Sequence, residues 1–113
     1  MRTLATAFTC LFLLALSAFP QSTARIVGTV RDSSGAAVPD ATVSAVNTQT
    51  SLRETRQTAA DGTFSIPLLP VGRYEVEISK QGFQKVVRSG IILAVNDNAT
   101  VDVSLNVGAV SES

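Results

Sequence analysis

The amino-acid sequence predicts an all-β fold, a seven-stranded antiparallel β-sandwich with Greek-key connections that follows an N-terminal signal peptide. Three observations favour this fold class. Short runs alternate apolar and polar side chains, turn residues separate these runs, and no stretch after residue 24 has the 3.6-residue period of a helix. So many short runs in one small domain indicate a sandwich rather than a parallel sheet.

Residues 1–24 have the composition of a secretory signal. Met1 and Arg2 supply a positive start, residues 4–18 are almost wholly apolar, and residues 22–24 (Ser-Thr-Ala) offer the small side chains that signal peptidase prefers. A cut after Ala24 would remove the signal. We therefore expect the mature chain to be secreted across the inner membrane into the periplasm, or to be associated with the outer membrane.

Two alternatives apply to this segment. A cut after Ala18 is possible, although Leu16 is bulky where a small residue is preferred. A membrane anchor is the other alternative, but the apolar run is shorter than the roughly 20 residues of a spanning helix. The single cysteine, Cys10, lies inside the run rather than after it, which does not favour a lipid anchor. We expect no membrane span in the mature chain.

The composition after residue 24 excludes several function classes. That part of the chain has no Cys, His, Met or Trp, so it can form no disulfide within itself, and its Lys and Arg nearly balance its Asp and Glu. A nucleic-acid-binding domain would need a basic face for the phosphates, so no nucleic-acid partner is expected. A catalytic zinc site needs His or Cys ligands, and a Ser-His-acid triad needs a histidine, so both are excluded. We expect no enzyme activity, catalytic residue, metal or cofactor.

The sequence of the first half of the domain predicts three strands. Residues 26–31 form the first, in which Gly28 marks a bulge or the close approach of another backbone. A turn at residues 32–35 leads to a second strand at residues 41–47. Residues 52–58 carry polar side chains on both faces, so they are expected at the edge of a sheet.

The second half begins with the stretch that organises the fold. An Asp61-Gly62 turn opens a short strand, and Pro67 and Pro70, which lack backbone donors, are expected to take the chain out of any β-ladder. Tyr74 then begins an alternation that places it, with Val76 and Ile78, on one face. This pattern predicts an antiparallel strand with one buried face.

The remaining residues predict the last strands and a tail. Residues 83–95 are expected as two short strands divided at Ser89-Gly90, or as one strongly bulged strand. A turn at residues 96–98 precedes a final strand at residues 99–105, in which the odd-numbered Val101, Val103 and Leu105 face inward. The domain is therefore expected to cover residues 25–106, and residues 107–113 to form a flexible tail.

Few side chains qualify as binding or catalytic groups. The carboxylates of Asp32, Asp40, Asp61 and Asp97 fall at predicted turns, where Asp is common because it bonds its own backbone. A carbohydrate-binding surface would need exposed aromatic rings, and the mature chain offers only Phe64, Tyr74 and Phe83. All three are expected in the core. If the chain binds sugar, Tyr74 and Phe83 are the tentative ligand contacts.

Two stretches resemble the carboxypeptidase regulatory-like domain. They are GTVRDSSGAAVPDATVSAVN at residues 28–47 and DGTFSIPLLPVGRYEVEISKQGFQK at residues 61–85. The family pattern has G-x-V-x-D-x-x-G, P-x-A-x-V, D-G-x-F, L-x-P-G-x-Y and G-F in this order. The resemblance covers residues 26–105, and its one departure is the insertion of Val71 between Pro70 and Gly72.

This resemblance implies a transthyretin-like sandwich that serves as an accessory module and not as a peptidase. Similar domains begin TonB-dependent outer-membrane receptors of the Oar-like kind, directly after the signal peptide. The implied partner is an envelope protein or the remainder of such a receptor. Related sandwiches are grouped with starch-binding-like folds, which leaves carbohydrate binding as the alternative function. The Lys–Asn isopeptide bond of similar stalk domains is not expected, because the first strand carries Arg25 and Arg31 but no Lys.

Overall fold

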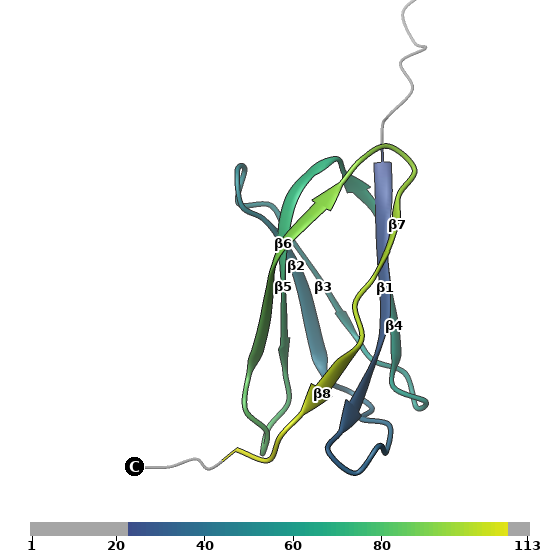
Figure 1. The fold of residues 1–113 in the computed structure, drawn as a ribbon, viewed down its shortest axis with the longest axis vertical. Coiled ribbons are helices and arrows are strands. Elements are labelled where there is room, and N and C mark those ends of the chain that lie inside the picture. Colours follow the sequence, from purple (N-terminus) through teal and green to yellow (C-terminus); the bar gives the residue numbers. More distant parts are fainter. Residues whose placement is uncertain (1–22, 109–113) are drawn as a thin grey trace, which may run out of the picture.

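The protein is a sandwich of two facing β-sheets in the computed structural model, which describes residues 23–108 (Figure 1). The predicted all-β sandwich is confirmed. The strands are β1 (Thr23–Asp32), β2 (Thr42–Asn47), β3 (Arg53–Gln57), β4 (Thr63–Pro70), β5 (Gly72–Ser79), β6 (Val86–Leu93), β7 (Asn98–Thr100) and β8 (Val103–Leu105). No helix of the described residues is long and apolar enough to cross a membrane.

The two sheets differ in how their strands pair. One sheet has the order β3-β2-β5-β6, and all its neighbours are antiparallel. In the other, β1 lies in the middle, pairing with β4 on one side and with β7 and β8 on the other. The pairing of β1 with β7 and β8 is parallel, so the sandwich is not antiparallel throughout.

A close contact at Gly28 divides the predicted last strand into β7 and β8. Both pieces keep one register against β1, because Ile26 lies opposite Ala99 and Val30 opposite Val103. Between these pairs, a Cβ atom on Gly28 would lie 1.8 Å from the carbonyl oxygen of Val101. Only glycine allows the two backbones to approach so closely. The prediction of a close backbone approach at Gly28 is confirmed.

The two prolines do not take the chain out of the sheet, so that expectation was wrong. Strand β4 continues through Pro67 to Pro70, and it pairs with β1 again at Leu69 and Pro70 after a register shift. Leu68 occupies the shifted position with a φ of 60°. Strand β4 is the edge of its sheet, and an edge strand tolerates a missing backbone donor on its open side.

The other edge strands follow the sequence predictions. Strand β3 lies at the edge of its sheet, as its charged faces indicated. Residues 86–93 form one bulged strand rather than two, with Tyr74 opposite Ile91 and Val76 opposite Arg88. Ser89 and Gly90 both lie opposite Glu75, so the bulge contains one extra residue. Bulges bend a strand and increase its local twist.

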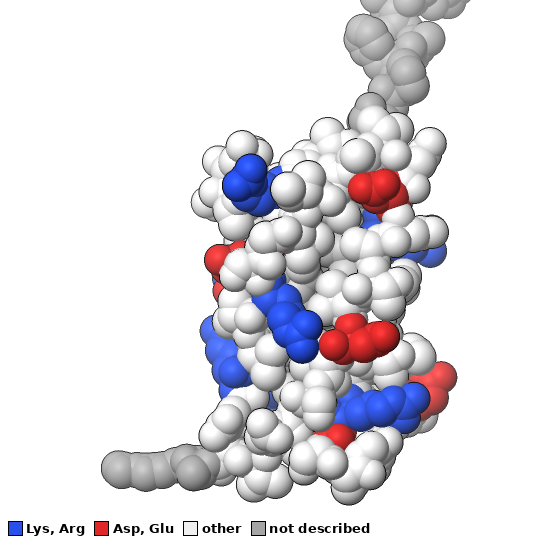
Figure 2. Space-filling view, in the orientation of Figure 1, with Lys and Arg blue, Asp and Glu red and all other residues white. Residues whose placement is uncertain are grey.

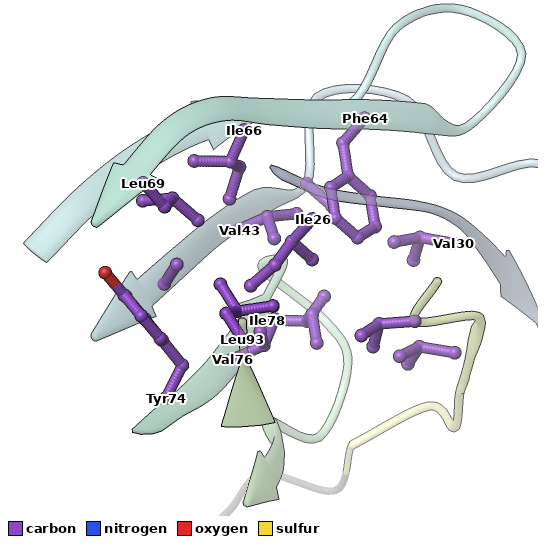
Figure 3. Packing of buried hydrophobic residues seen from close by; sticks show 14 of the residues in the cluster. Ile26, Val30, Val43, Phe64, Ile66, Leu69, Tyr74, Val76, Ile78 and Leu93 are labelled. Carbon is purple, nitrogen blue, oxygen red and sulfur yellow. The ribbon is translucent and has the colours of Figure 1, made fainter. Parts of the chain in front are cut away.

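The core lies between the two sheets and is built from the inward faces of nearly all the strands (Figure 3). Tyr74, Val76 and Ile78 of β5 are fully buried, which confirms the alternation predicted for that strand. The predicted inward positions of the last strands are also buried. Because no disulfide crosslinks the domain, this apolar contact between the sheets is what stabilises it.

Paired residues lie just outside the expected limits of 25–106 at both ends. Thr23 and Ala24, expected in the signal, are the first residues of β1. At the other terminus, the backbone of Val107 forms a bridge with Phe83, and the Gly108 N–H donates to the carbonyl of Gly82 over 2.9 Å. The first two residues of the expected flexible tail are therefore part of the fold. Residues 109–113 lie outside the described part of the chain.

Candidate functional site

Tyr74 lies in the core and presents no ring face to a ligand. Its side chain is 0% exposed. Its hydroxyl donates a 2.7 Å hydrogen bond to the carbonyl oxygen of Pro70, at the rim of the sandwich (Figure 3). Sugar recognition by an aromatic side chain needs an open ring face. The tentative assignment of Tyr74 as a ligand contact therefore does not fit its position.

Phe83, the other tentative ligand contact, is half-buried in the turn between β5 and β6. Its ring packs against the edge of the core, and its backbone is paired with Val107. Phe64 is buried, with a residual exposure of 5%. The three aromatic rings of the domain therefore form no continuous surface on which a sugar could stack.

The turn carboxylates bond their own loops. Oδ1 of Asp32 accepts hydrogen bonds from the Ser34 hydroxyl over 2.6 Å and from the backbone N–H groups of Ser34 and Ala36, and these bonds lower the pKa of Asp32. Oδ1 of Asp61 accepts from the hydroxyl and N–H of Thr63, which lowers the pKa of Asp61. These carboxylates stabilise turns, as their positions in the sequence predicted.

One ion-pair cluster lies on the outer face of the β3-β2-β5-β6 sheet. Glu77 of β5 contacts Arg53 of β3 at 3.1 Å and Lys85 at 3.7 Å. The hydrogen bond from Arg53 and the two positive charges hold the pKa of Glu77 below its ordinary value. The cluster crosslinks neighbouring strands through one carboxylate. It offers no pair of carboxylates for acid–base catalysis.

The buried polar side chains have partners within the fold. Thr58 accepts a hydrogen bond from the Ala41 N–H and donates one to the Val38 carbonyl over 2.6 Å. Asn47 accepts from the N–H groups of the following loop, and Ser44 bonds Thr55. Among residues 23–108, no group of three or more His, Cys, Asp or Glu side chains could hold a metal ion.

Exposed apolar side chains, in contrast, gather at one end of the sandwich. Of the exposed large hydrophobic side chains in residues 23–108, five belong to the loops and strand ends around the start of β1. We call these five residues the apolar end: Leu52, Leu68, Val71, Ile92 and Val95. The other two exposed ones are Val87, in the first half of β6, and Val107, beyond β8.

The strand pairing places the five residues at the same end. Thr23, at the start of β1, lies opposite Pro70, at the end of β4, and Gly72 lies opposite Leu93. The loop after β2 joins them through the Thr48 N–H, which donates to the carbonyl of Arg73 over 2.9 Å. The β2–β3, β4–β5 and β6–β7 connections therefore lie next to one another at the top of Figure 1.

Leu68 is the most unusual residue of this end. Its side chain is 76% exposed, and its backbone has a φ of 60° in the left-handed region. Leucine is disfavoured there by about 1–2 kcal/mol because its Cβ crowds the backbone. Ser51 and Asn96, in the two neighbouring loops, also have positive φ values. Backbone strain of this kind clusters at functional sites.

A depression of about 180 Å³ lies beside Leu68. Its lining residues come from the start of β1, from β4 and from the turn before β7: Thr23, Ala24, Arg25, Leu68, Asn96, Asp97 and Asn98. A wider groove of about 480 Å³ lies near the opposite end, beside the turn after β1, and Arg31, Asp32 and Asp102 contribute to it. The apolar end thus combines exposed hydrophobic side chains with hydrogen-bonding groups, a combination typical of protein–protein contacts.

Sequence reasoning missed the apolar end, although a signal for it was present. Adjacent residues of a strand point to opposite faces. In Leu68-Leu69 one leucine must therefore face away from the core, and the same holds for the middle residue of Ile91-Ile92-Leu93. Leu69 and Leu93 are buried, while Leu68 and Ile92 are exposed.

The free strand edges are poorly suited to pairing with a partner. Strand β4 carries Pro67 and Pro70, β3 carries charged side chains, and β6 is bulged. The fourth edge consists of β7 and β8, which are three residues long each. Such features protect edge strands from pairing with other chains. The first strand cannot add to a partner's sheet, because β1 is paired on both sides.

Comparison with known proteins relates this chain to one domain family and to a transporter. The sequence profile of the carboxypeptidase regulatory-like domain matches residues 25–106. The TonB-dependent transporter Oar of Myxococcus xanthus is 36% identical over 97 residues, an alignment that includes 85% of this chain. The chain covers only 9% of that transporter's length.

Solved structures share the fold at low sequence identity. The Bacillus anthracis TIE protein superposes with a TM-score of 0.64 at 16% identity, covering 76% of this chain and 17% of that protein. The 3-chlorocatechol 1,2-dioxygenase of Rhodococcus opacus has a TM-score of 0.60 at 13% identity, covering 79% and 62%. A Bacteroides uniformis protein proposed to bind carbohydrate has a TM-score of 0.57 at 15% identity, covering 73% and 40%. These similarities establish a shared architecture only.

Proposed function

Because the chain belongs to the carboxypeptidase regulatory-like domain family, we propose that it is a non-catalytic accessory module of the bacterial cell envelope that acts by protein contact. In this proposal, residues before β1 direct export across the inner membrane. The domain then works in the periplasm as the N-terminal extension of a TonB-dependent outer-membrane receptor, or as a fragment of one. Its partner is the remainder of that receptor or another envelope protein.

The relationship to a transporter supports the receptor part of the proposal. The similar segment in the M. xanthus protein makes up a small part of a much longer chain. A small module in such a chain is suited to docking or to positioning a larger neighbour. The balanced surface charge also fits a protein partner, since Lys and Arg are interspersed with Asp and Glu over the face shown in Figure 2.

The observation that carries the contact mechanism is the apolar end. Exposed hydrophobic side chains scattered singly need no explanation, whereas a group of them around one end marks an interaction site. Strand β8 ends at the opposite end of the sandwich, because Leu105 lies opposite Asp32, the last residue of β1. Any chain that continues beyond Gly108 therefore starts from the end opposite the apolar end.

The contact proposed here uses loops rather than strand addition. The edges carry prolines, charges or a bulge, or consist of strands only three residues long, while the three loops of the apolar end are held by backbone hydrogen bonds. The Asn96 N–H donates to the Thr23 carbonyl over 2.9 Å. In the β2–β3 loop, the backbone N–H groups of Gln49 and Thr50 both donate to the side-chain oxygen of Asn47. Preorganised loops lose little conformational entropy on binding, so they form contacts efficiently.

Affinity capture from the outer membrane tests the proposal. The tagged domain is incubated with detergent-solubilised outer membranes of the source bacterium, and captured proteins are identified by mass spectrometry. A TonB-dependent receptor polypeptide is the expected partner. The double variant Leu68→Gly and Ile92→Thr should reduce its recovery at least tenfold, because it removes the two most exposed side chains of the apolar end.

Val107→Thr is the matched control, since Val107 is 72% exposed but lies at the opposite end. It should leave recovery unchanged. Capture of no envelope protein, or equal recovery with the apolar-end variant and the wild type, would contradict the proposed mechanism. Circular dichroism of each variant establishes that the β-sandwich is retained.

Carbohydrate binding is the alternative function, and it has less support. Tyr74 is buried, and Phe83 is half-buried behind the C-terminal residues, so an aromatic platform is lacking. Titration with a panel of glycans at millimolar concentration tests it through the amide signals around Phe83. Shifts that saturate would support a sugar site, and their absence across the panel would eliminate it.

A further inference from the structure

The start of β1 is an integral part of the sandwich. Thr23 pairs with Pro70 and Ala24 pairs with Leu69. The carbonyl of Thr23 accepts a 2.9 Å hydrogen bond from the Asn96 N–H, and Ala24 is only 5% exposed. These two residues thus connect β1 to the end of β4 and to the β6–β7 loop.

This position conflicts with removal of the signal after Ala24. A cut there would delete both residues and leave β1 starting at Arg25. Leu69, which is fully buried, would lose its paired neighbour and be uncovered on that side, and Asn96 would lose its acceptor. Burial of apolar surface is what stabilises a small domain without disulfides, so such a loss is unfavourable.

The sequence offers small residues further upstream, at the end of the apolar run. Signal peptidase selects a small residue at the last position before the cut and another two positions earlier. Ala15-Leu16-Ser17 satisfies both positions, and Ala18 follows at once. A cut after Ala18 has a small residue, Ala18, at the last position before the cut, but the bulky Leu16 lies two positions earlier.

We propose that signal peptidase cuts this chain after Ser17 or Ala18, upstream of β1, and that residues 19–24 remain on the mature protein. Water adds across the peptide bond, leaving a carboxylate on the released signal and a new ammonium group on the domain. The new ammonium group then belongs to Ala18 or Phe19, several positions before Thr23 in the sequence. The inference rests on the export proposed above.

Intact-mass measurement of the protein purified from the periplasm or envelope tests the inference directly. The full-length gene is expressed in a Gram-negative host, and the N-terminus is read from the mass and from tandem fragmentation. A terminus at Ala18 or Phe19 is expected. A terminus at Arg25, or at any residue after Ser22, would overturn the inference while leaving export intact.

Two sets of substitutions separate the candidate cuts without touching the fold. Ser17→Leu with Ala18→Leu removes the small residue before each proposed cut, and we expect the termini at Ala18 and Phe19 to disappear from the mass spectrum. Ser22→Leu disables only the downstream site and should leave processing unchanged. If Ser22→Leu blocks processing instead, the cut lies after Ala24. Uncut wild-type chain overturns the inference, and its recovery in the cytoplasm would also contradict export itself.

Purified chains beginning at Phe19 and at Arg25 provide an independent readout. The chain beginning at Arg25 should unfold at a lower urea concentration, since it lacks the first two residues of β1. Equal midpoints would show that Thr23 and Ala24 add nothing to stability, which would remove the structural basis of the inference.

Discussion

Gly28 occupies the most restricted position in the sandwich, because the backbone of Val101 lies directly over its Cα. Replacement by alanine places a methyl group 1.8 Å from the Val101 carbonyl oxygen, and backbone atoms on both sides must move. We expect Gly28→Ala to reduce the free energy of unfolding by about 3 kcal/mol, as overpacking does in a tight core. Urea denaturation measures this loss.

Gly35→Ala is the control for that variant. Gly35 has a φ of 90°, but a Cβ atom there would meet nothing within 4 Å. Gly35→Ala should lower the free energy of unfolding by only about 1 kcal/mol, which is the cost of the backbone strain. Equal losses for the two variants would mean that the contact at Gly28 is not what restricts the position.

Leu68 and Leu69 are adjacent, yet their substitutions should differ greatly. Leu69→Ala removes a fully buried side chain and should cost about 3 kcal/mol. Leu68→Gly should change stability by less than about 0.5 kcal/mol, because relief of the left-handed strain offsets the added freedom of the unfolded chain. Thermal and urea unfolding of both variants test this contrast. A large loss for Leu68→Gly would contradict the view that Leu68 serves binding rather than folding.

The pH dependence of stability follows from the carboxylates. Hydrogen bonds lower the pKa of Asp32 and Asp61, and the hydrogen bond and charge of Arg53 lower that of Glu77. A depressed pKa stabilises the fold above the ordinary pKa of the group, and this contribution is lost as the pH falls through the folded-state pKa. The chain has no histidine, so no side chain with an ordinary pKa titrates between about pH 5.5 and 8.

We therefore expect the urea midpoint to stay constant from about pH 8 to 5.5 and to fall below about pH 4.5. Asp32→Asn combined with Asp61→Asn should reduce this acid sensitivity. A midpoint that changes mainly between pH 6 and 7 would contradict the assignment, since no side chain discussed here titrates in that range.

At the scale of elements, most strands could be predicted because their alternation reports burial directly. The alternation from Tyr74 to Ile78, and that of Val101 and Val103, correctly predicted which side chains face the core. The course of β4 could not be predicted, because Pro67 and Pro70 are forbidden in a central strand and allowed at an edge, and only the assembled sheet decides which applies. The start of β1 was missed for a similar reason, since Thr23 and Ala24 also suit a cleavage site.

The C-terminal residues were expected as a tail because their pairing is non-local. Gln84 donates to the Asn106 carbonyl over 2.8 Å, and Gly108 donates to the Gly82 carbonyl. Nothing in the local sequence signals these bonds. Truncation after Leu105 should therefore cost about 2 kcal/mol, from two backbone hydrogen bonds and the partial uncovering of Phe83. Truncation after Gly108 is the control and should leave the urea midpoint unchanged.

At the scale of the whole molecule, the sequence predicted the fold better than the site. The missing side-chain types excluded common catalytic centres at once. The apolar end, however, is assembled from three connections and the strand ends beside them, which are distant in the sequence. Its residues are apolar and so suggest core positions. Only the positions of Leu68 and Ile92 beside buried leucines hinted that they face solvent.

Site-specific photo-crosslinking in living cells tests the central claim most directly. A photoreactive amino acid is placed at residue 68 or 92 of the apolar end, and at residue 107 of the opposite end as control. The account predicts crosslinks from residues 68 and 92 to a TonB-dependent receptor or another envelope protein, and few or none from residue 107. Equal crosslinking from both ends, or none from residues 68 and 92, would contradict a contact made through the apolar end.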